Sequence, residues 1–447
     1  MKDQELLTEG DVNFSPSRKD WQASLDGDTR DALQADSAVF LHQALSTPCL
    51  DELVACEGIW LTDRSGKRYM DFHGNNVHQV GYRNPRVLDH LKQQLDTLPF
   101  SPRRYSNPVA TGLAQKLVSL LPRPLNRVLL APGGTSVVGI ALKLARAVTG
   151  KHQVITYEDS FHGASLDAIA AGGEEQFKRY MGPQAHEGIN IPQPMNYRNS
   201  RPGDDMHYAD LLEEAIIRDG QVGAFMAETV RNTDVQVPSK KYWQRVREIC
   251  DKHGVLLILD EIPIAFGRTG KMFAFEHYGI VPDILCLGKG MGGGLFPIAA
   301  IVAREEYNRF PEISLGHYTW EKSPLGCAAA MGVIECIEQD HLLEKVIEDE
   351  AYMCAAMSAL MRKYDVIGDV RGLGLLWGIE LVTDRQTREK AYTVAEHTMY
   401  GCLERGLSFK ISQGNVLQLS PPLTIPRADL ERAMAIVDEA IAAALKK

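Results

Sequence analysis

The sequence predicts an α/β fold built around a mostly parallel sheet. Six short apolar runs recur in its middle part, at 126–131, 152–157, 222–228, 254–261, 283–288 and 298–303. Helical patterns such as SVVGIALKLARAV and KKYWQRVREICDKHG lie between several of these runs. Strands that alternate with helices form parallel sheets whose faces the helices cover. Ligands of such sheets bind at the carboxyl ends of the strands, so we expect the functional residues there.

The elements on either side of this sheet follow from similar patterns. Residues 1–50 are polar and weakly patterned, which favours an arm that packs on a partner or on the body of the protein. Residues 58–72 alternate around D-R-S-G and predict a hairpin. Helical periodicity follows at 85–99 and 108–121. After about residue 330 we expect a long helix, strands in LLWGIELV and NVLQLSPPL, and a closing helix at 427–446.

The length of the chain predicts more than one domain, because 447 residues are too many for one compact core. We expect an N-terminal arm and small-domain segment at 1–85. A large α/β domain then covers 86–329, and a smaller α+β domain covers 330–447.

Composition indicates an ordinary globular protein with a net charge of −10. That charge argues against nucleic acid or an anionic membrane as the main partner. No apolar run is long enough to span a membrane, and the first residues do not resemble a secretory signal. The eight cysteines show no C-x-x-C pair or zinc-finger spacing, so we expect no metal site, reduced cysteines and a cytoplasmic location.

Three features at the ends of predicted strands carry chemistry. The loop PGGTS at 132–136 can direct backbone N–H groups at an anion, although a tight turn explains it equally well. Asp260 and Glu261 close a buried strand, where a structural ion pair is the plainer explanation. Lys289 follows another buried strand and precedes four glycines in five residues. Most such lysines simply extend to solvent.

Together the three features predict a site for pyridoxal 5′-phosphate (PLP). A lysine amine forms a Schiff base with the aldehyde of this cofactor, and an aspartate keeps its pyridine nitrogen protonated. The glycine-rich loop would hold the phosphate. We therefore expect Lys289 and Asp260 to be the catalytic residues.

From about residue 55 onward the sequence resembles the class III aminotransferases, a family of fold-type I PLP enzymes. The resemblance rests on an ordered series of motifs: GIWLTDRSGKRYMDF, GGTSVVGIALKLAR, FHG at 161–163, DEIPIAFGRTG at 260–270, LGKGMGGG at 287–294, HYTW at 317–320, RGLGLLWGIELV and NVLQLSPPLTI. The series as a whole is far more specific than any one motif. It implies a large domain with a mostly parallel sheet and a smaller α+β domain.

The resemblance also implies roles for individual residues. Lys289 would be the Schiff-base lysine, and Asp260 would pair with the pyridine nitrogen. The other expected cofactor contacts are Gly134 and Thr135 at the phosphate, Phe161 stacked on the ring, His162, Glu228, and Thr319 from the neighbouring subunit. His162 is as well suited to support its loop as to touch the cofactor. The role of Thr319 implies a homodimer with shared active sites.

Two positions depart from the aminotransferase pattern. Many family members bind the acceptor carboxylate with an arginine just before P-P-L, where this sequence has Gln418. A glutamate that often holds this arginine aside would fall at Thr233, in the loop AETVRNTD. A neutral glutamine cannot replace a bidentate guanidinium, although an arginine from elsewhere could serve.

The stretch GNNVHQVG at 74–81 is similar to the lyase branch of the family, which includes phosphoethanolamine phospho-lyases. These enzymes eliminate a β-substituent and release ammonia without a keto acid. We therefore expect an ammonia-lyase that removes water from a hydroxylated amino-phosphonate through an external aldimine. The alternatives are an ω-amine:keto-acid aminotransferase, a phospho-lyase, and a degenerate member that only binds cofactor; the intact lysine, aspartate and phosphate loop argue against the last.

A dianionic phosphonate needs cations or amide donors. The expected substrate contacts are Arg104, Arg231, Asn75, Asn76 and Gln418, with Arg103 and Lys322 as further candidates. For each cation, a solvated surface charge or a salt bridge between subunits is at least as good an explanation.

Overall fold

The computed structural model describes residues 15–44, 46–47, 49–184, 187–195, 197–199 and 204–446. Its centre is a seven-stranded sheet with the order β4-β10-β9-β8-β7-β5-β6. The strands are β4 (Leu125–Ala131), β5 (Gln153–Tyr157), β6 (Ile189–Ile191), β7 (Val222–Glu228), β8 (Leu256–Asp260), β9 (Ile284–Leu287) and β10 (Ala299–Arg304). All six apolar runs form strands as predicted. Only β6, three residues long, has no counterpart in the prediction.

The sheet is mostly parallel, as predicted. β6, β5, β7, β8 and β9 run in one direction, and β10 is antiparallel to both β9 and β4. β4 therefore runs parallel to β9, and its carboxyl end lies at the same edge of the sheet as the ends of β7, β8 and β9. Every residue of β7, β8 and β9 is buried, which explains their continuous apolar sequences.

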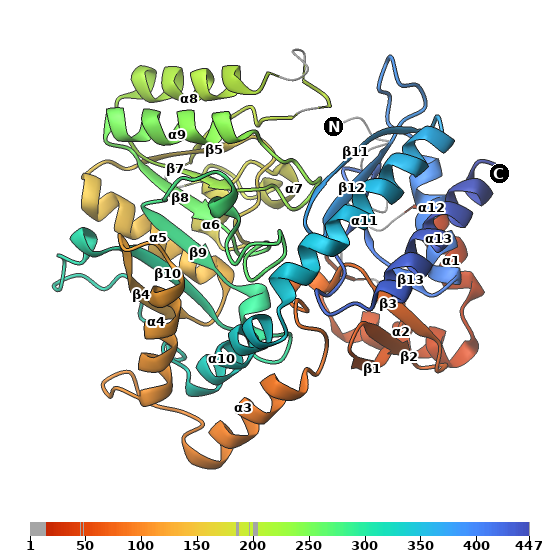
Figure 1. The fold of residues 1–447 in the computed structure, drawn as a ribbon, viewed down its shortest axis with the longest axis horizontal. Coiled ribbons are helices and arrows are strands. Elements are labelled where there is room, and N and C mark those ends of the chain that lie inside the picture. Colours follow the sequence, from red (N-terminus) through yellow and green to blue (C-terminus); the bar gives the residue numbers. More distant parts are fainter. Residues whose placement is uncertain are drawn as a thin grey trace.

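Helices cover both faces of this sheet (Figure 1). Alternate strand residues pack into two separate apolar clusters, one with α5 (Gly134–Thr149) and one with α9 (Lys240–His253). α8 (Met206–Asp219) lies beside α9, and the short α6 (Leu166–Ala171) and α7 (Glu175–Lys178) follow β5. α3 (Pro85–Thr97) and α4 (Pro108–Leu120) form as predicted, and both contact α10 (Pro324–Gln339).

The C-terminal part forms a second unit around a sheet with the order β11-β12-β15-β14. These strands are β11 (Ile367–Leu373), β12 (Leu376–Leu381), β14 (Lys410–Ser412) and β15 (Val416–Leu419). The helices are α11 (Leu342–Lys363), α12 (Tyr392–Glu404) and α13 (Arg427–Ala444). Two helices, α10 and α11, stand where the sequence predicts one. The domain boundary predicted between residues 329 and 330 falls within α10. The boundary stays a prediction.

The predicted hairpin forms, and it belongs to a sheet that joins the two ends of the chain. β1 (Leu53–Glu57), β2 (Trp60–Asp63) and β3 (Arg68–Asp71) are antiparallel, and β13 (Leu407–Ser408) adds to β3 in parallel. In Figure 1 these N-terminal strands accordingly lie beside the blue C-terminal elements. This pairing supports the assignment of 1–85 to the smaller domain, which we keep as a proposal.

The described part of the N-terminal arm folds onto the body of the protein. It contains α1 (Pro16–Ser24) and α2 (Gly27–Val39), although its sequence is weakly patterned. Trp21 lies 5.7 Å from the ring of Tyr400 in α12, and its Nε1 donates to the carbonyl of Leu50 over 3.0 Å. A few apolar contacts therefore dock the arm, which explains why periodicity alone missed these helices. Residues 1–14 lie outside the described residues.

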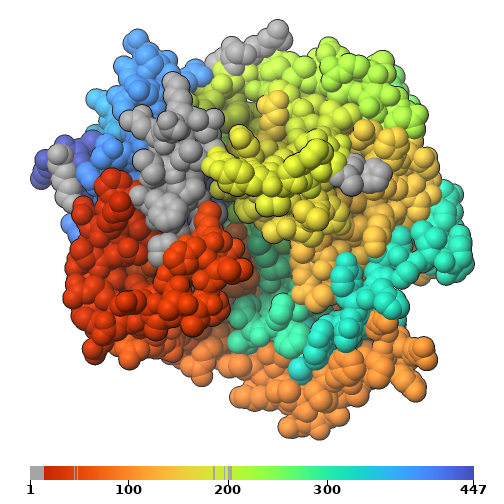
Figure 2. All heavy atoms as spheres, turned by 180° about the vertical axis from the view of Figure 1, so that it is seen from behind, coloured from red at the N-terminus to blue at the C-terminus, as the bar shows by residue number. Residues whose placement is uncertain are grey.

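From behind, the molecule is hollowed between the red N-terminal segments and the yellow region that includes α6 and α7 (Figure 2). Among the described residues, no helix is both long enough and apolar enough to cross a membrane.

Substitution of Trp21 tests this docking. Trp21 is 9% exposed, so Trp21→Ala should remove its apolar burial and one hydrogen bond. We expect the free energy of unfolding to fall by about 3 kcal/mol, measured by urea denaturation. Val39 in α2 is 77% exposed and serves as the control. Val39→Ala should change the free energy of unfolding by less than about 0.5 kcal/mol. Equal stability of the Trp21→Ala variant and the wild type would show that the arm is not held by this side chain.

Candidate active site

The carboxyl ends of β7, β8 and β9 bring two acids and a lysine together. Glu228 pairs with Asp260 across β7 and β8, and Asp260 pairs with Cys286 across β8 and β9. Lys289 follows the end of β9 by two residues. The sheet register therefore puts Glu228, Asp260 and Lys289 at one edge, as expected for neighbouring parallel strands.

Asp260 is buried and fully engaged. Its Oδ2 lies 2.8 Å from Nδ1 of His162, and its Oδ1 accepts a hydrogen bond from the backbone N–H of Ile262 over 3.0 Å. His162 is buried as well, and no described group bonds to its Nε2. The structure thus places His162 behind the carboxylate, where the imidazole orients Asp260.

Glu261 has a different role from its neighbour. Its carboxylate accepts hydrogen bonds from the hydroxyl of Thr229 and from the backbone N–H groups of Ala274 and Phe275, over 2.7 to 2.8 Å. These bonds satisfy a fully buried acid without a cation. The Asp-Glu pair therefore divides into one residue that serves the candidate site and one that supports the loop after β8.

Lys289 begins the short 3-10 helix η4 (Lys289–Gly292) in a left-handed conformation, with φ of 45°. Its side chain is accessible to solvent, but a wider shell of protein atoms surrounds it. This surrounding protein lowers the pKa of the Lys289 amine, while the charges of Asp260 and Glu228 partly oppose the shift. An accessible amine with a lowered pKa is suited to covalent chemistry and to proton transfer.

The turn between β4 and α5 is a candidate anion site. α5 begins at Gly134 after the N-cap Gly133, and no described side chain caps its first N–H groups. A phosphate can take these donors. The hydroxyl of Thr135 lies 2.8 Å from that of Ser165, beside the same turn. A Cβ atom on Gly163 would come within 2.3 Å of the Thr135 hydroxyl, so the FHG loop reaches this turn only with glycine there.

Ile262 supplies an apolar wall between the turn and the lysine. It is buried, and Cβ atoms on Gly134 and Gly288 would lie 3.2 and 3.3 Å from its side chain. Phe161 lies in the FHG loop, half-buried, with its ring 4.5 Å from that of Phe177. The arrangement leaves an anion site, an acid and an amine around apolar side chains.

Glu228 sits beside Asp260 and has an unusual affinity for a proton. Its Oε2 accepts a hydrogen bond from the backbone N–H of Asn232 over 3.0 Å. Burial, together with the negative charge of Asp260, raises the pKa of Glu228 to about 7. Glu228 therefore binds a proton more tightly than an exposed glutamate does.

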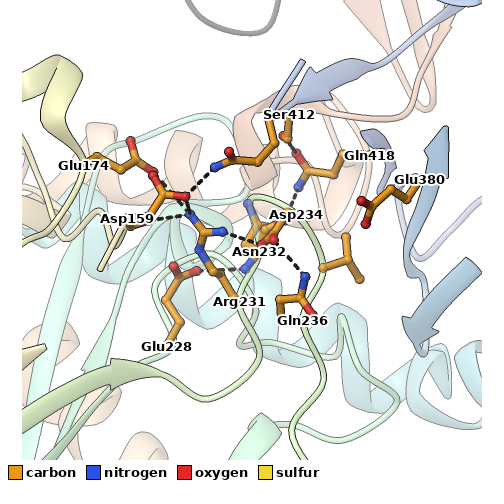
Figure 3. Close-up of polar contacts among 12 residues, drawn as sticks. Asp159, Glu174, Glu228, Arg231, Asn232, Asp234, Gln236, Glu380, Ser412 and Gln418 are labelled. Carbon is orange, nitrogen blue, oxygen red and sulfur yellow. Dashed lines mark hydrogen bonds and ion pairs between the residues drawn. The ribbon is translucent and has the colours of Figure 1, made fainter. Parts of the chain in front are cut away.

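Arg231 lies in the loop after β7, inside a cluster of acids (Figure 3). Its Nη1 lies 2.5 Å from Asp234, and its Nη2 donates to the carbonyl of Asp159 and approaches the carboxylates of Asp159 and Glu174 at 3.3 and 3.7 Å. Although burial opposes its charge, these carboxylates raise the pKa of Arg231. The guanidinium is therefore committed to protein groups, and its role as a substrate ligand stays a prediction.

Gln418 is buried in β15 and is also engaged. Its Nε2 donates to the carbonyl of Asn232 over 2.8 Å, and its Oε1 accepts from the hydroxyl of Ser412 over 3.5 Å (Figure 3). Gln418 therefore ties the smaller domain to the loop after β7. In this position it holds the loop that contains Thr233.

The other expected substrate and cofactor contacts differ in their exposure to solvent. Asn75 and Asn76 have φ of 46° and 58°, and asparagine is one of the few residues that adopts this conformation easily. Asn76 is buried and accepts a hydrogen bond from Ser420 over 3.2 Å, whereas Asn75 is exposed. Arg104 and Thr319 are exposed, so a role for them at a shared site stays a prediction.

Sequence reasoning missed Ser165 and Ile262, and also His73 and Lys410. Ser165 lies three residues after His162, within a loop whose conformation no motif predicts. His73 directly follows the predicted hairpin. Lys410 carried one local signal, a charged residue at the start of the short strand KIS, whose other two residues are buried.

Taken together, these residues fit PLP. The uncapped start of α5 suits its phosphate, Asp260 suits its pyridine nitrogen, and Lys289 suits its aldehyde. The unpartnered Nε2 of His162 and the raised pKa of Glu228 both indicate a polar, charged group within this site.

The pKa of Glu228 predicts a pH effect on the cofactor-free protein. Between pH 4.5 and 7 the Glu228 carboxyl keeps its proton in the folded chain but loses it in the unfolded chain. Because the folded chain then binds more protons, the free energy of unfolding falls as the pH rises. When the pH rises from 5 to 8, the free energy of unfolding of the wild type should fall by up to about 3 kcal/mol relative to that of Glu228→Gln. Urea denaturation measures both values. Glu248→Gln, at a side chain that is 68% exposed, is the control. If the two proteins differed in free energy of unfolding by the same amount at every pH, the raised pKa of Glu228 would be refuted.

Comparison with known proteins gives the family. The model of class III aminotransferases matches residues 46–441. The chain is 54% identical to the (R)-1-hydroxy-2-aminoethylphosphonate ammonia-lyase of Vibrio splendidus, over 100% of this chain and 97% of the relative. It is 34% identical to the leucine/methionine racemase of Thermococcus litoralis, over 86% and 88% of the two chains.

Solved structures agree with this match. A PLP-bound amine transaminase from an uncultivated Pseudomonas species superposes with a TM-score of 0.85 at 29% identity, over 91% of this chain and 99% of that one. A taurine:2-oxoglutarate aminotransferase from Bifidobacterium kashiwanohense, in complex with PLP and glutamate, has a TM-score of 0.87 at 26% identity, over 94% and 98%. The matched family model and the full-length relatives show that the chain belongs to the class III aminotransferase family.

Proposed function

We propose that the protein is a PLP-dependent ammonia-lyase that converts (R)-1-hydroxy-2-aminoethylphosphonate to phosphonoacetaldehyde and ammonia. The observation that carries this proposal is the 54% identity, along the whole chain, to a Vibrio splendidus protein of that name. Relatives with other activities in their names are 30 to 34% identical. The geometry of the site supports the same reaction.

The proposed chemistry depends on the residues at the strand ends. PLP, when bound, draws electrons away from the amine-bearing carbon of the substrate. Asp260 would hold the proton at the pyridine nitrogen, and His162 and the N–H of Ile262 hold Asp260 in place. Gly134 and Thr135 would bind the phosphate at the start of α5. Phe161 and Ile262 exclude water from the apolar part of the site.

Lys289 would provide the covalent link to the cofactor and would then act as the base. Its lowered pKa leaves more of the amine neutral, so that it can accept the proton from the amine-bearing carbon. Loss of this proton and of hydroxide from the neighbouring carbon leaves an enamine. Water converts its imine tautomer to the aldehyde and ammonia, so the net reaction consumes no keto acid.

The same geometry argues against transamination. A keto-acid acceptor needs a cation for its carboxylate, and the position that provides one in many family members is Gln418. Its amide is bonded to the carbonyl of Asn232. Thr233 likewise has no charge with which to hold a mobile arginine.

We further propose a cytoplasmic homodimer with shared active sites. The described cysteines are all free, and five of the eight are buried, which suits a reducing compartment. Thr319 and Trp320 are exposed on the segment after β10, where a partner subunit could receive them. Tyr318 anchors the same segment through a hydrogen bond of 3.5 Å to the carbonyl of Ser136.

Ammonia release without a keto acid tests the proposal. With PLP present, (R)-1-hydroxy-2-aminoethylphosphonate should yield ammonia and an aldehyde but no free phosphate, and the S enantiomer should react poorly. 2-Aminoethylphosphonate should not react, because it lacks the leaving group. Ammonia with phosphate from phosphoethanolamine would instead indicate a phospho-lyase. Alanine formed only when pyruvate is added would overturn the proposal in favour of an aminotransferase.

Lys289→Ala separates the role of the amine from folding. We expect ammonia release to fall by about 100- to 10,000-fold, because both the covalent link and the base are lost. Borohydride reduction followed by denaturation should leave cofactor on the wild type and none on the variant. Lys241→Ala, on the exposed surface of α9, is the control and should behave as the wild type. Full activity of Lys289→Ala would remove this residue from the mechanism.

A further inference from the structure

His73 and Lys410 lie where the smaller domain meets the hairpin sheet. His73 follows the end of β3 by two residues, and β3 pairs in parallel with β13. The backbone N–H of Phe72 donates to Ser408 over 2.8 Å, and the N–H of Ser420 donates to Phe72 over 2.7 Å. These bonds hold the backbone that follows β3, at residues 72 and 73, close to the start of β14 at Lys410.

Lys410 occupies the strand position directly opposite Gln418. The two residues are partners in the antiparallel pair of β14 and β15, so their side chains leave the same face of the sheet. Gln418 extends from this face to the carbonyl of Asn232, in the loop after β7. The face that carries Lys410 therefore looks toward the carboxyl edge of the large sheet, where Asp260 and Lys289 lie.

The charges around His73 favour an anion. Burial lowers the pKa of His73 most, and the positive charges of Lys410 and Lys289 lower it further, against the opposing charge of Asp71. Asp71 itself accepts hydrogen bonds from two backbone N–H groups and from the hydroxyl of Tyr82. The His73 imidazole therefore feels the positive charges of both Lys410 and Lys289, and a bound dianion would offset them.

Arg231 offers a poorer place for a dianion. The carboxylates of Asp159, Asp234 and Glu174 surround its guanidinium, and they would repel a phosphonate. Burial raises the pKa of Glu174, and the positive charges of Arg231 and Lys410 oppose this shift. Glu174 therefore interacts electrostatically with Lys410 as well as with Arg231. The charge of Lys410 thus acts on Glu174 as well as on His73.

We propose that Lys410 and His73 form the subsite that binds the phosphonate group of the substrate. The inference rests on the proposed function, whose substrate it anchors. Lys410 would supply a positive charge and donors, and His73 a ring N–H, to phosphonate oxygens. Anchored there, the other end of a two-carbon aminophosphonate would extend toward Lys289.

Binding of a non-reacting analogue to the holoenzyme tests the subsite. 2-Aminoethylphosphonate lacks the leaving hydroxyl, and its Kd is measured from the change in absorbance of the bound cofactor. Lys410→Met should raise this Kd by about 10- to 100-fold, since a charge-assisted contact is lost. His73→Phe should raise it by about threefold to tenfold. n-Propylamine has no phosphonate, and its Kd should stay unchanged in both variants.

Matched variants keep the test decisive. Lys410→Arg retains the charge and should bind 2-aminoethylphosphonate more tightly than Lys410→Met, and Lys410→Gln replaces the Met variant if that protein does not fold. Lys92→Met, in α3 with a side chain that is 69% exposed, should match the wild type. An equal loss for both ligands, or no loss in any neutral variant at Lys410, would overturn the proposal.

The outcome is separable from that of the proposed function. If the wild type releases no ammonia from the hydroxylated phosphonate but Lys410→Met selectively loses 2-aminoethylphosphonate, the subsite stands and the reaction is wrong. If ammonia is released and Lys410 has no effect on binding, the reaction stands and the phosphonate binds elsewhere. Arg231→Gln would then be the next variant to measure.

Discussion

The buried carboxylate of Asp260 is the constraint on which the rest of the site depends. A charge at the end of a fully buried strand is costly unless its oxygens are bonded. Here His162 and the N–H of Ile262 provide those bonds. Because His162 belongs to the loop after β5, satisfying Asp260 also places that loop, with Phe161 and Gly163, against the start of α5. One buried acid thus organises three strand ends.

The strands themselves determine how close the charged groups come. Parallel pairing sets Glu228 level with Asp260, and β9 brings Lys289 to the same edge. Burial and the charge of Asp260 raise the pKa of Glu228, whereas burial lowers the pKa of Lys289 against the charges of Asp260 and Glu228. The site is therefore prepared for a cofactor that carries both a cationic ring and an anionic phosphate.

The loop after β7 and the strand β15 give this member of the family its own character. Arg231 is held by acids, and Gln418 is bonded to the backbone of that loop, so neither residue swings freely over the site. The absence of a free arginine at Gln418 suits a reaction with one substrate, whereas alternation between two substrates needs a mobile cation.

The sequence by itself determined the α/β class and the six apolar strands, and it predicted Lys289 and Asp260 as the centre of the site, because strand burial and motif spacing are local properties of the chain. It did not reveal that the weakly patterned arm contains two helices, which depend on contacts such as that of Trp21 with α12. Only the tertiary structure showed that Asp260 faces His162 while Glu261 supports a loop, or that Arg231 is enclosed by acids. These assignments require residues far apart in the chain to meet, and pairing between distant segments leaves no periodic trace in the sequence.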